Sequence, residues 1–185
     1  MMNRVFVVAL LASLAMACGG QSGHNVQGAI GTENVAFLLT ESEIEAHGRD
    51  GLDVYGDVFG FMDRARESGA NIEDVEAWVG IDYAESVDSS RVNFALMDMV
   101  DLLSAHARFD EITQDFLLVE SEQGIGDRFA GLAPKSGNVD TIVMFLVADK
   151  VVVITTTTSL VDRHPLMTSE QLVEIARLVA PRIIS

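Results

Sequence analysis

Two consecutive runs of β-branched and aromatic residues near the C-terminus constrain the fold more than any other feature. They span residues 139–147 (VDTIVMFLV) and 151–158 (VVVITTTT), with Asp149 and Lys150 between them. Such residues favour strands, and a connection this short predicts a hairpin. In the second run both sets of alternating side chains are apolar at first and bear hydroxyls later. We therefore expect a central strand that becomes more exposed towards its end.

The rest of the sequence alternates between helix and strand signals. Thr40 with Glu43, and Thr168 with Gln171, have the spacing of capping boxes, which begin helices. In full, the sequence predicts strands at 35–39, 75–83, 92–97, 116–119, 139–147 and 151–158, and helices at 40–47, 54–67, 98–115 and 168–181. This order predicts one α+β domain in which helices pack against an antiparallel sheet.

Gly56 and Gly60 lie four residues apart in the predicted helix 54–67. A glycine inside a helix costs about 1 kcal/mol relative to alanine. Glycines at this spacing also pack helices in membranes, but charged residues such as Asp57 and Arg64 flank them here. We therefore expect that the glycines allow close approach of a sheet or a neighbouring helix.

The N-terminus has the pattern of an export signal. Residues 5–16 are apolar and follow Arg4, and the small Ala17 precedes Cys18. The apolar stretch is shorter than the roughly 20 residues of a transmembrane helix. The alternatives to a lipoprotein signal are an ordinary cleaved signal and a membrane span. The segment LAMAC, which ends at Cys18, resembles the lipobox of bacterial lipoproteins and implies that Cys18 becomes a lipidated first residue.

We expect three segments in the chain: a signal peptide at 1–17, a lipidated cysteine and flexible tether at 18–32, and a globular domain at 33–185. Residues 19–32 contain five glycines, and a chain of this kind has a reach of roughly 20 Å. Cys18 is the single cysteine, so a hydrophobic core must stabilise the domain without an internal disulfide. The lipobox resemblance implies an anchor in the outer membrane, facing the periplasm, or on the outer face of a single plasma membrane.

The charge of the chain excludes some classes of partner. It carries 28 acidic and 12 basic side chains, for a net charge of −16. Nucleic-acid binding depends on Lys and Arg at phosphates, and docking on anionic lipid depends on the same residues. We expect no nucleic-acid partner, and membrane contact through the lipid anchor alone. The acidic surface serves either solubility or a basic partner.

The sequence contains no strong catalytic motif. A nucleophile elbow, a phosphate-binding loop and a His-Glu-x-x-His zinc motif are all missing from it. His106 and Asp110 are weak metal candidates, because they share a helix face but zinc needs three or four ligands. Asp50, Asp53 and Asp57 lack the spacing of a calcium loop. We predict no catalytic residue and no cofactor, and assign solvated or core positions to the remaining candidates, which are His24, His47, Trp78, Tyr83 and His164.

The last third of the chain combines Gly126-Asp127, the hairpin turn at Asp149-Lys150 and a helix with Ile175-Ala176. It resembles the end of exported bacterial domains of the LpqN/PsbP-like and kinase extracellular-sensor kinds. The resemblance implies a domain that binds a ligand or partner. We therefore predict a lipid-anchored extracytoplasmic module that binds a partner protein or small ligand. The alternatives are a structural or assembly lipoprotein of the envelope and a hydrolase with a carboxylate-based site.

Overall fold

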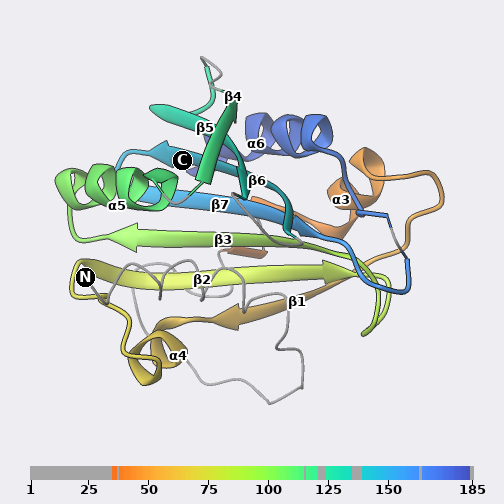
Figure 1. Ribbon diagram of the computed structural model, residues 1–185, viewed down its shortest axis with the longest axis horizontal. Helices are drawn as coiled ribbons and strands as arrows, with labels where there is room; N and C mark the ends of the chain where they lie inside the picture. Colours follow the sequence, from red (N-terminus) through yellow and green to blue (C-terminus); the bar gives the residue numbers. More distant parts are fainter. Residues whose placement is uncertain are drawn as a thin grey trace.

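The computed structural model describes residues 35–36, 38–114, 116–120, 124–134, 139–162 and 164–183. Within them, seven strands form one sheet in the order β1-β2-β3-β7-β6-β5-β4, and every neighbouring pair is antiparallel (Figure 1). The elements are α3 (Glu41–His47), β1 (Tyr55–Gly60), α4 (Met62–Glu67), β2 (Val75–Ala84), β3 (Arg91–Met99), α5 (Leu102–Gln114), β4 (Phe116–Glu120), β5 (Arg128–Pro134), β6 (Val139–Val147), β7 (Lys150–Thr157) and α6 (Ser169–Ile183). The predicted α+β class, with helices on an antiparallel sheet, is confirmed.

The hairpin of β6 and β7 forms as the sequence predicts. Ala148 and Asp149 make its turn; Ala148 has a φ of 52°, and its N–H donates to Asp127 Oδ2 at 2.7 Å. β7 lies between β3 and β6 in the middle of the sheet. Its residues are buried from Val151 onward, and exposure begins only at Thr157. The predicted central position of this strand is confirmed.

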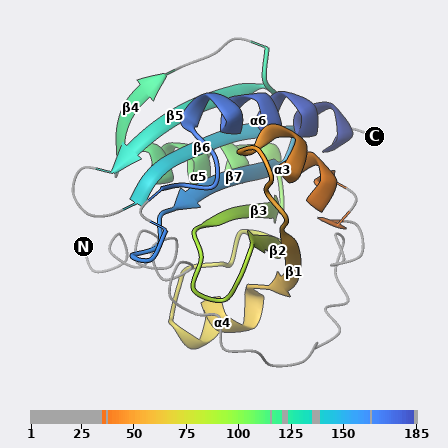
Figure 2. The same cartoon turned by 90° about the vertical axis from the view of Figure 1, so that its right-hand side faces the viewer.

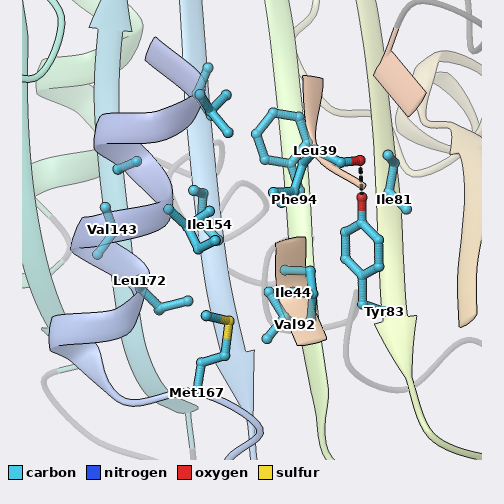
Figure 3. Packing of buried hydrophobic residues seen from close by; sticks show 14 of the residues in the cluster. Leu39, Ile44, Ile81, Tyr83, Val92, Phe94, Val143, Ile154, Met167 and Leu172 are labelled. Atoms are coloured by element: carbon cyan, nitrogen blue, oxygen red, sulfur yellow. Dashed lines mark hydrogen bonds between the residues drawn. The ribbon is translucent and has the colours of Figure 1, made fainter. Parts of the chain in front are cut away.

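A separate hydrophobic core lies on each face of the sheet. Val152 and Ile154 belong to the core under α3 and α6, where Figure 3 shows Leu172 of α6 packed above the strands. Val151 and Val153 belong to the second core, which also contains side chains of α4 and α5. Successive strand side chains point to opposite faces. A strand that is apolar on both faces therefore needs helices on both sides of the sheet.

Capping and a charged contact fix the two helices of the first core. Both predicted capping boxes form: Glu43 accepts the Thr40 N–H, and Gln171 accepts the Thr168 N–H at 2.8 Å. Arg182 of α6 donates to both carboxylate oxygens of Glu43, at 3.0 and 2.6 Å. These bonds lower the pKa of Glu43 to about 2. They connect α3 directly to the last turn of α6.

The sequence predicts that the C-terminal helix stops near Pro181, but α6 continues through this proline to Ile183. Proline removes one N–H donor and disturbs the preceding turn most strongly in a helix interior. Pro181 lies in the last turn, where the helix tolerates it.

The predicted strand at 35–39 is wrong, because Val35, Ala36 and Leu38 are helical. Val35 and Leu39 are both buried in the core under α3 and α6. A spacing of four residues brings two side chains to the same side of a helical turn. A short apolar run fits a buried helical turn as well as a buried strand.

The predicted helix at 54–67 is also wrong in its first half. Residues Tyr55–Gly60 form edge strand β1, and only Met62–Glu67 are helical. Pairing with β2 overrides the helical spacing of the apolar residues. A Cβ atom at Gly56 would lie 3.1 Å from Cε1 of Tyr83, so this glycine lets β1 lie against the ring. Gly56 thus allows the expected close approach to the sheet, but as part of strand β1 and not as part of a helix.

Two further predictions fail around α5 and β5. The predicted helix at 98–115 begins too early, because Asp98 lies in β3, where it pairs with Lys150 at 3.1 Å and cannot cap the helix. Asp101 accepts the Ser104 N–H at 2.7 Å instead, at the start of α5. Strand β5 has no counterpart in the prediction, because Gly131 and Pro134 weaken its strand pattern.

Candidate functional site

Three connections of the chain meet at one end of the sheet. Tyr55, Ala84, Arg91 and Thr157 are partners across β1, β2, β3 and β7. The connections at these positions are 48–54 before β1, 85–90 between β2 and β3, and 158–164 after β7, in which residue 163 is not described. We call these connections together with Tyr55 the loop end. It lies on the right of Figure 1, and Figure 2 looks onto it.

Ser90 holds two of these connections together. Its hydroxyl donates to the His164 carbonyl oxygen at 2.6 Å and accepts the Ser159 N–H at 2.9 Å. Its own N–H donates to Asp162 Oδ2 at 2.6 Å. Ser90 is fully buried, although Ser86, Val87 and Asp88 in the same connection are exposed. These bonds therefore join the base of the 85–90 connection to the 158–164 connection.

Ion pairs attach the loop end to the sheet. Arg91 binds Asp82 at 2.5 Å, and both side chains are nearly buried. Arg91 also donates to the carbonyl oxygen of Val87, which ties the 85–90 connection to β3. Arg49 pairs with Glu85 and so joins the 48–54 connection to its neighbour. The Arg49–Glu85 pair lies within the loop end, whereas Arg91 and Asp82 pair on the strands β3 and β2 beside it.

Large apolar side chains project from this fixed base. Leu160 is 91% exposed, Val161 74%, Val87 64% and Tyr55 43%. Scattered apolar side chains are ordinary on protein surfaces, but contiguous ones mark interaction sites. Here Val87, Leu160 and Val161 lie on connections that Ser90 bonds together. The loop end is the candidate functional site.

Exposed carboxylates accompany these apolar side chains. Asp50, Asp53, Asp57 and Asp88 are exposed, and their carboxylates make no hydrogen bond or ion pair with another described residue. Asp57 lies in β1, two residues from Tyr55, whereas Asp50 and Asp53 lie in the connection before it. Among the described residues, no group of three or more His, Cys, Asp or Glu side chains is placed to hold a metal ion.

The weak metal candidates His106 and Asp110 lie on α5, away from the loop end, and Arg128 of β5 contacts both. Arg128 donates to Asp110 Oδ1 at 2.6 Å and lies 3.4 Å from His106 Nδ1. Its guanidinium also stacks 4.3 Å from the centre of the Phe109 ring. The hydrogen bond from Arg128 lowers the pKa of Asp110. Among the described residues, the positive charge beside Asp110 is therefore the guanidinium of Arg128.

The other candidate residues are spread over the fold. His47 contacts Glu174 at 3.4 Å between α3 and α6, and His164 contributes its carbonyl oxygen to Ser90. Trp78 packs on Phe61 in the second core. Tyr83 donates to the Leu39 carbonyl oxygen at 2.6 Å, and burial raises its pKa (Figure 3). Cys18 and His24 lie outside the described residues.

The search for chemical motifs missed the exposed residues of the loop end. Val87 stands within ESVDSS, and Leu160 and Val161 within TSLVDRHP. Both segments are polar and turn-rich, as loops at the surface are, so a large apolar residue stands out in them. A large apolar residue within a polar loop segment is therefore the sequence feature that points to this surface. The hydrogen bonds of Ser90 to Ser159 and His164 join residues about 70 positions apart, and no local pattern predicts them.

Comparison with known proteins identifies a shared fold. No protein-family model matches the chain, and no curated protein sequence matches it. Among solved structures, the chain is similar to the extracellular domain of PknH from Mycobacterium tuberculosis. The TM-score is 0.50 at 12% identity, over 88% of this chain and 99% of that one. No helix in the described part of the chain is long and apolar enough to cross a membrane.

Proposed function

We propose that the chain is an exported, lipid-anchored module of the bacterial cell envelope that binds a partner through the loop end. The observation that carries the proposal is the exposure of Val87, Leu160 and Val161 on connections joined by Ser90. Ordering a loop during binding costs conformational entropy. A fixed base avoids part of that cost, which favours a binding role for this surface.

Export and anchoring are supported by the N-terminal sequence. The lipobox resemblance at Cys18 implies acylation, and two or more acyl chains anchor a protein stably. The glycine-rich segment 19–32 has the composition of a tether, which would let the domain turn towards a partner. The similarity to an extracellular domain supports the same location.

Anchoring is tested by fractionation of cells that produce the Cys18→Ser variant. We expect the unmodified chain in the membrane fraction and the variant outside it. Retention of the variant in the membrane fraction would contradict lipid anchoring through Cys18. The unmodified chain expressed at the same level is the control.

Binding through the loop end is tested by a photo-crosslinking residue at position 160 in the full chain in cells. The matched control is position 103, because Leu103 is 79% exposed but lies in the first turn of α5, which begins at the opposite end of the sheet (Figure 1). We expect one discrete crosslinked product from position 160 that position 103 does not give. The same product from both positions, or a product from position 103 alone, would contradict binding of the partner through the loop end.

This comparison also addresses the two alternative functions. A structural lipoprotein with contacts all around the domain would crosslink from both positions. A hydrolase with a carboxylate-based site would not require a contact at position 160. The binding module alone predicts a product that depends on the loop end.

A further inference from the structure

We infer that the partner of the loop end is a cationic polypeptide segment that presents apolar side chains flanked by Lys or Arg. This inference rests on the proposed binding function and adds the chemistry of the partner. Two features of the surface define that chemistry: an apolar centre, by which we mean the exposed side chains of Val87, Leu160, Val161 and Tyr55, and exposed carboxylates of the loop end and β1 that make no hydrogen bond or ion pair with another described residue.

The apolar centre selects for apolar side chains on the partner. Leu160, Val161 and Val87 give it aliphatic atoms, and Tyr55 adds an aromatic ring at the edge strand β1. Removing such surface from water stabilises a complex. Because Ser90 bonds the 85–90 and 158–164 connections to each other, the connections that carry Val87, Leu160 and Val161 are joined before the partner binds.

The carboxylates select for positive charge. The three connections contain five acidic and two basic residues by sequence. Arg49 is already paired with Glu85, whereas the carboxylates of Asp50, Asp53 and Asp88 make no hydrogen bond or ion pair with another described residue. The Asp57 carboxylate, two residues from Tyr55 in β1, likewise makes no hydrogen bond or ion pair with another described residue. Complementary charge at the rim of an interface increases specificity and the rate of association.

The same charges argue against a lipid surface as the occupant. Exposed apolar loop tips on a membrane-anchored protein would also suit insertion into a bilayer. Envelope membranes rich in anionic lipid repel a carboxylate rim, however, and the whole chain carries a net charge of −16. Lys and Arg on a polypeptide neutralise this rim, which an anionic headgroup does not do.

The inference is tested with the full chain in nonionic detergent and three fluorescent peptides. The first peptide is Lys-Lys-Leu-Val-Leu-Lys-Lys; the second replaces its centre with Ser-Thr-Ser, and the third replaces its lysines with glutamates. We expect fluorescence anisotropy to show binding of the first peptide, which weakens as salt is raised. Equal affinity for the first and second peptides, or binding of the third, would overturn the proposal.

Variants locate the binding. Replacing both Leu160 and Val161 with Ser should weaken the first peptide about tenfold, because partial burial of two aliphatic side chains is lost. Leu103→Ser should leave its affinity unchanged. Asp88→Asn should weaken it about twofold to threefold, as expected for one exposed charge pair. Glu67→Gln, an equal charge change at an exposed position of α4, should leave the affinity unchanged. Equal effects of Asp88→Asn and Glu67→Gln would show that only net charge matters and would overturn the proposal.

Hydrogen exchange separates a polypeptide from a lipid partner. The first peptide should slow amide exchange in residues 85–90 and 158–162. Phosphatidylglycerol added to the detergent micelles in its place should not, and slowing by the lipid alone would overturn the inference in favour of a membrane. If no peptide binds but position 160 still crosslinks in cells, the proposed function stands and only the assigned chemistry fails.

Discussion

Replacing Ser90 with Ala tests whether this buried hydroxyl holds the loop end together. The hydroxyl makes two hydrogen bonds, to the His164 carbonyl oxygen at 2.6 Å and from the Ser159 N–H at 2.9 Å. A typical hydrogen bond contributes about 1 kcal/mol net, and His164 and Ser159 lie near enough to the surface for water to replace part of the loss. We therefore expect Ser90→Ala to lower the free energy of unfolding by about 2 kcal/mol.

Urea unfolding of the full chain in nonionic detergent, followed by circular dichroism, measures this change. Ser86→Ala is the matched control, because Ser86 is exposed in the same connection and its hydroxyl makes no hydrogen bond with another described residue. A surface change of this kind stays within about 0.5 kcal/mol. Ser90→Ala should also speed amide exchange in residues 158–162. If the two variants unfold within about 0.5 kcal/mol of each other, the reasoning about a fixed loop end is refuted.

Two further predictions concern stability elsewhere in the fold. The folded pKa of Glu43, about 2, lies below its ordinary value of 4.5, so its pairing with Arg182 contributes stability above about pH 4.5 that is lost as the pH falls towards 2. Glu43→Gln should lower the free energy of unfolding at pH 7 by about 1 kcal/mol, for a partly exposed pair, and should show a smaller loss between pH 4.5 and pH 2; identical pH profiles would contradict this pairing. Gly126 has a φ of 62°, and a Cβ there would lie 2.2 Å from the Leu146 carbonyl oxygen, whereas Gly124 has a φ of 104° with open space around it. Gly126→Ala should therefore destabilise the domain by about 3 kcal/mol or more and Gly124→Ala by clearly less, as measured by thermal unfolding, and equal effects would contradict the assigned clash.

The sequence predicts the centre of the fold better than its edges. The hairpin of β6 and β7 is found because its residues are apolar on both faces and its turn is short. Helices α3 and α6, which Thr40 and Thr168 cap, are predicted because capping boxes are local signals. Residues 54–67 are misread because pairing with β2, a long-range contact, decides the structure of β1. Strand β5 is missed because Gly131 and Pro134 hide its pattern while its neighbours supply the pairing.

The candidate site was beyond the reach of motif searches for a physical reason. A catalytic or metal motif is recognised by the spacing of reactive residues along the sequence. The loop end is instead defined by apolar side chains that are exposed in the folded chain. Val87 and Leu160 can be named from the sequence, yet their exposure depends on how their connections fold. The bonds of Ser90 bring the two connections together, and they join residues far apart in the chain. His106 and Asp110 show the opposite case, since the pair was found from its spacing and Arg128 then contacts both.

The most direct test of the loop end as a binding surface is hydrogen exchange of the full chain in isolated cell envelopes, compared with the purified chain in detergent. The account predicts that exchange in residues 85–90 and 158–162 is slower in envelopes, while residues 100–106 at the opposite end of the sheet exchange equally in both. Equal exchange of residues 85–90 and 158–162 in the two preparations, or slowing at residues 100–106 alone, would contradict it.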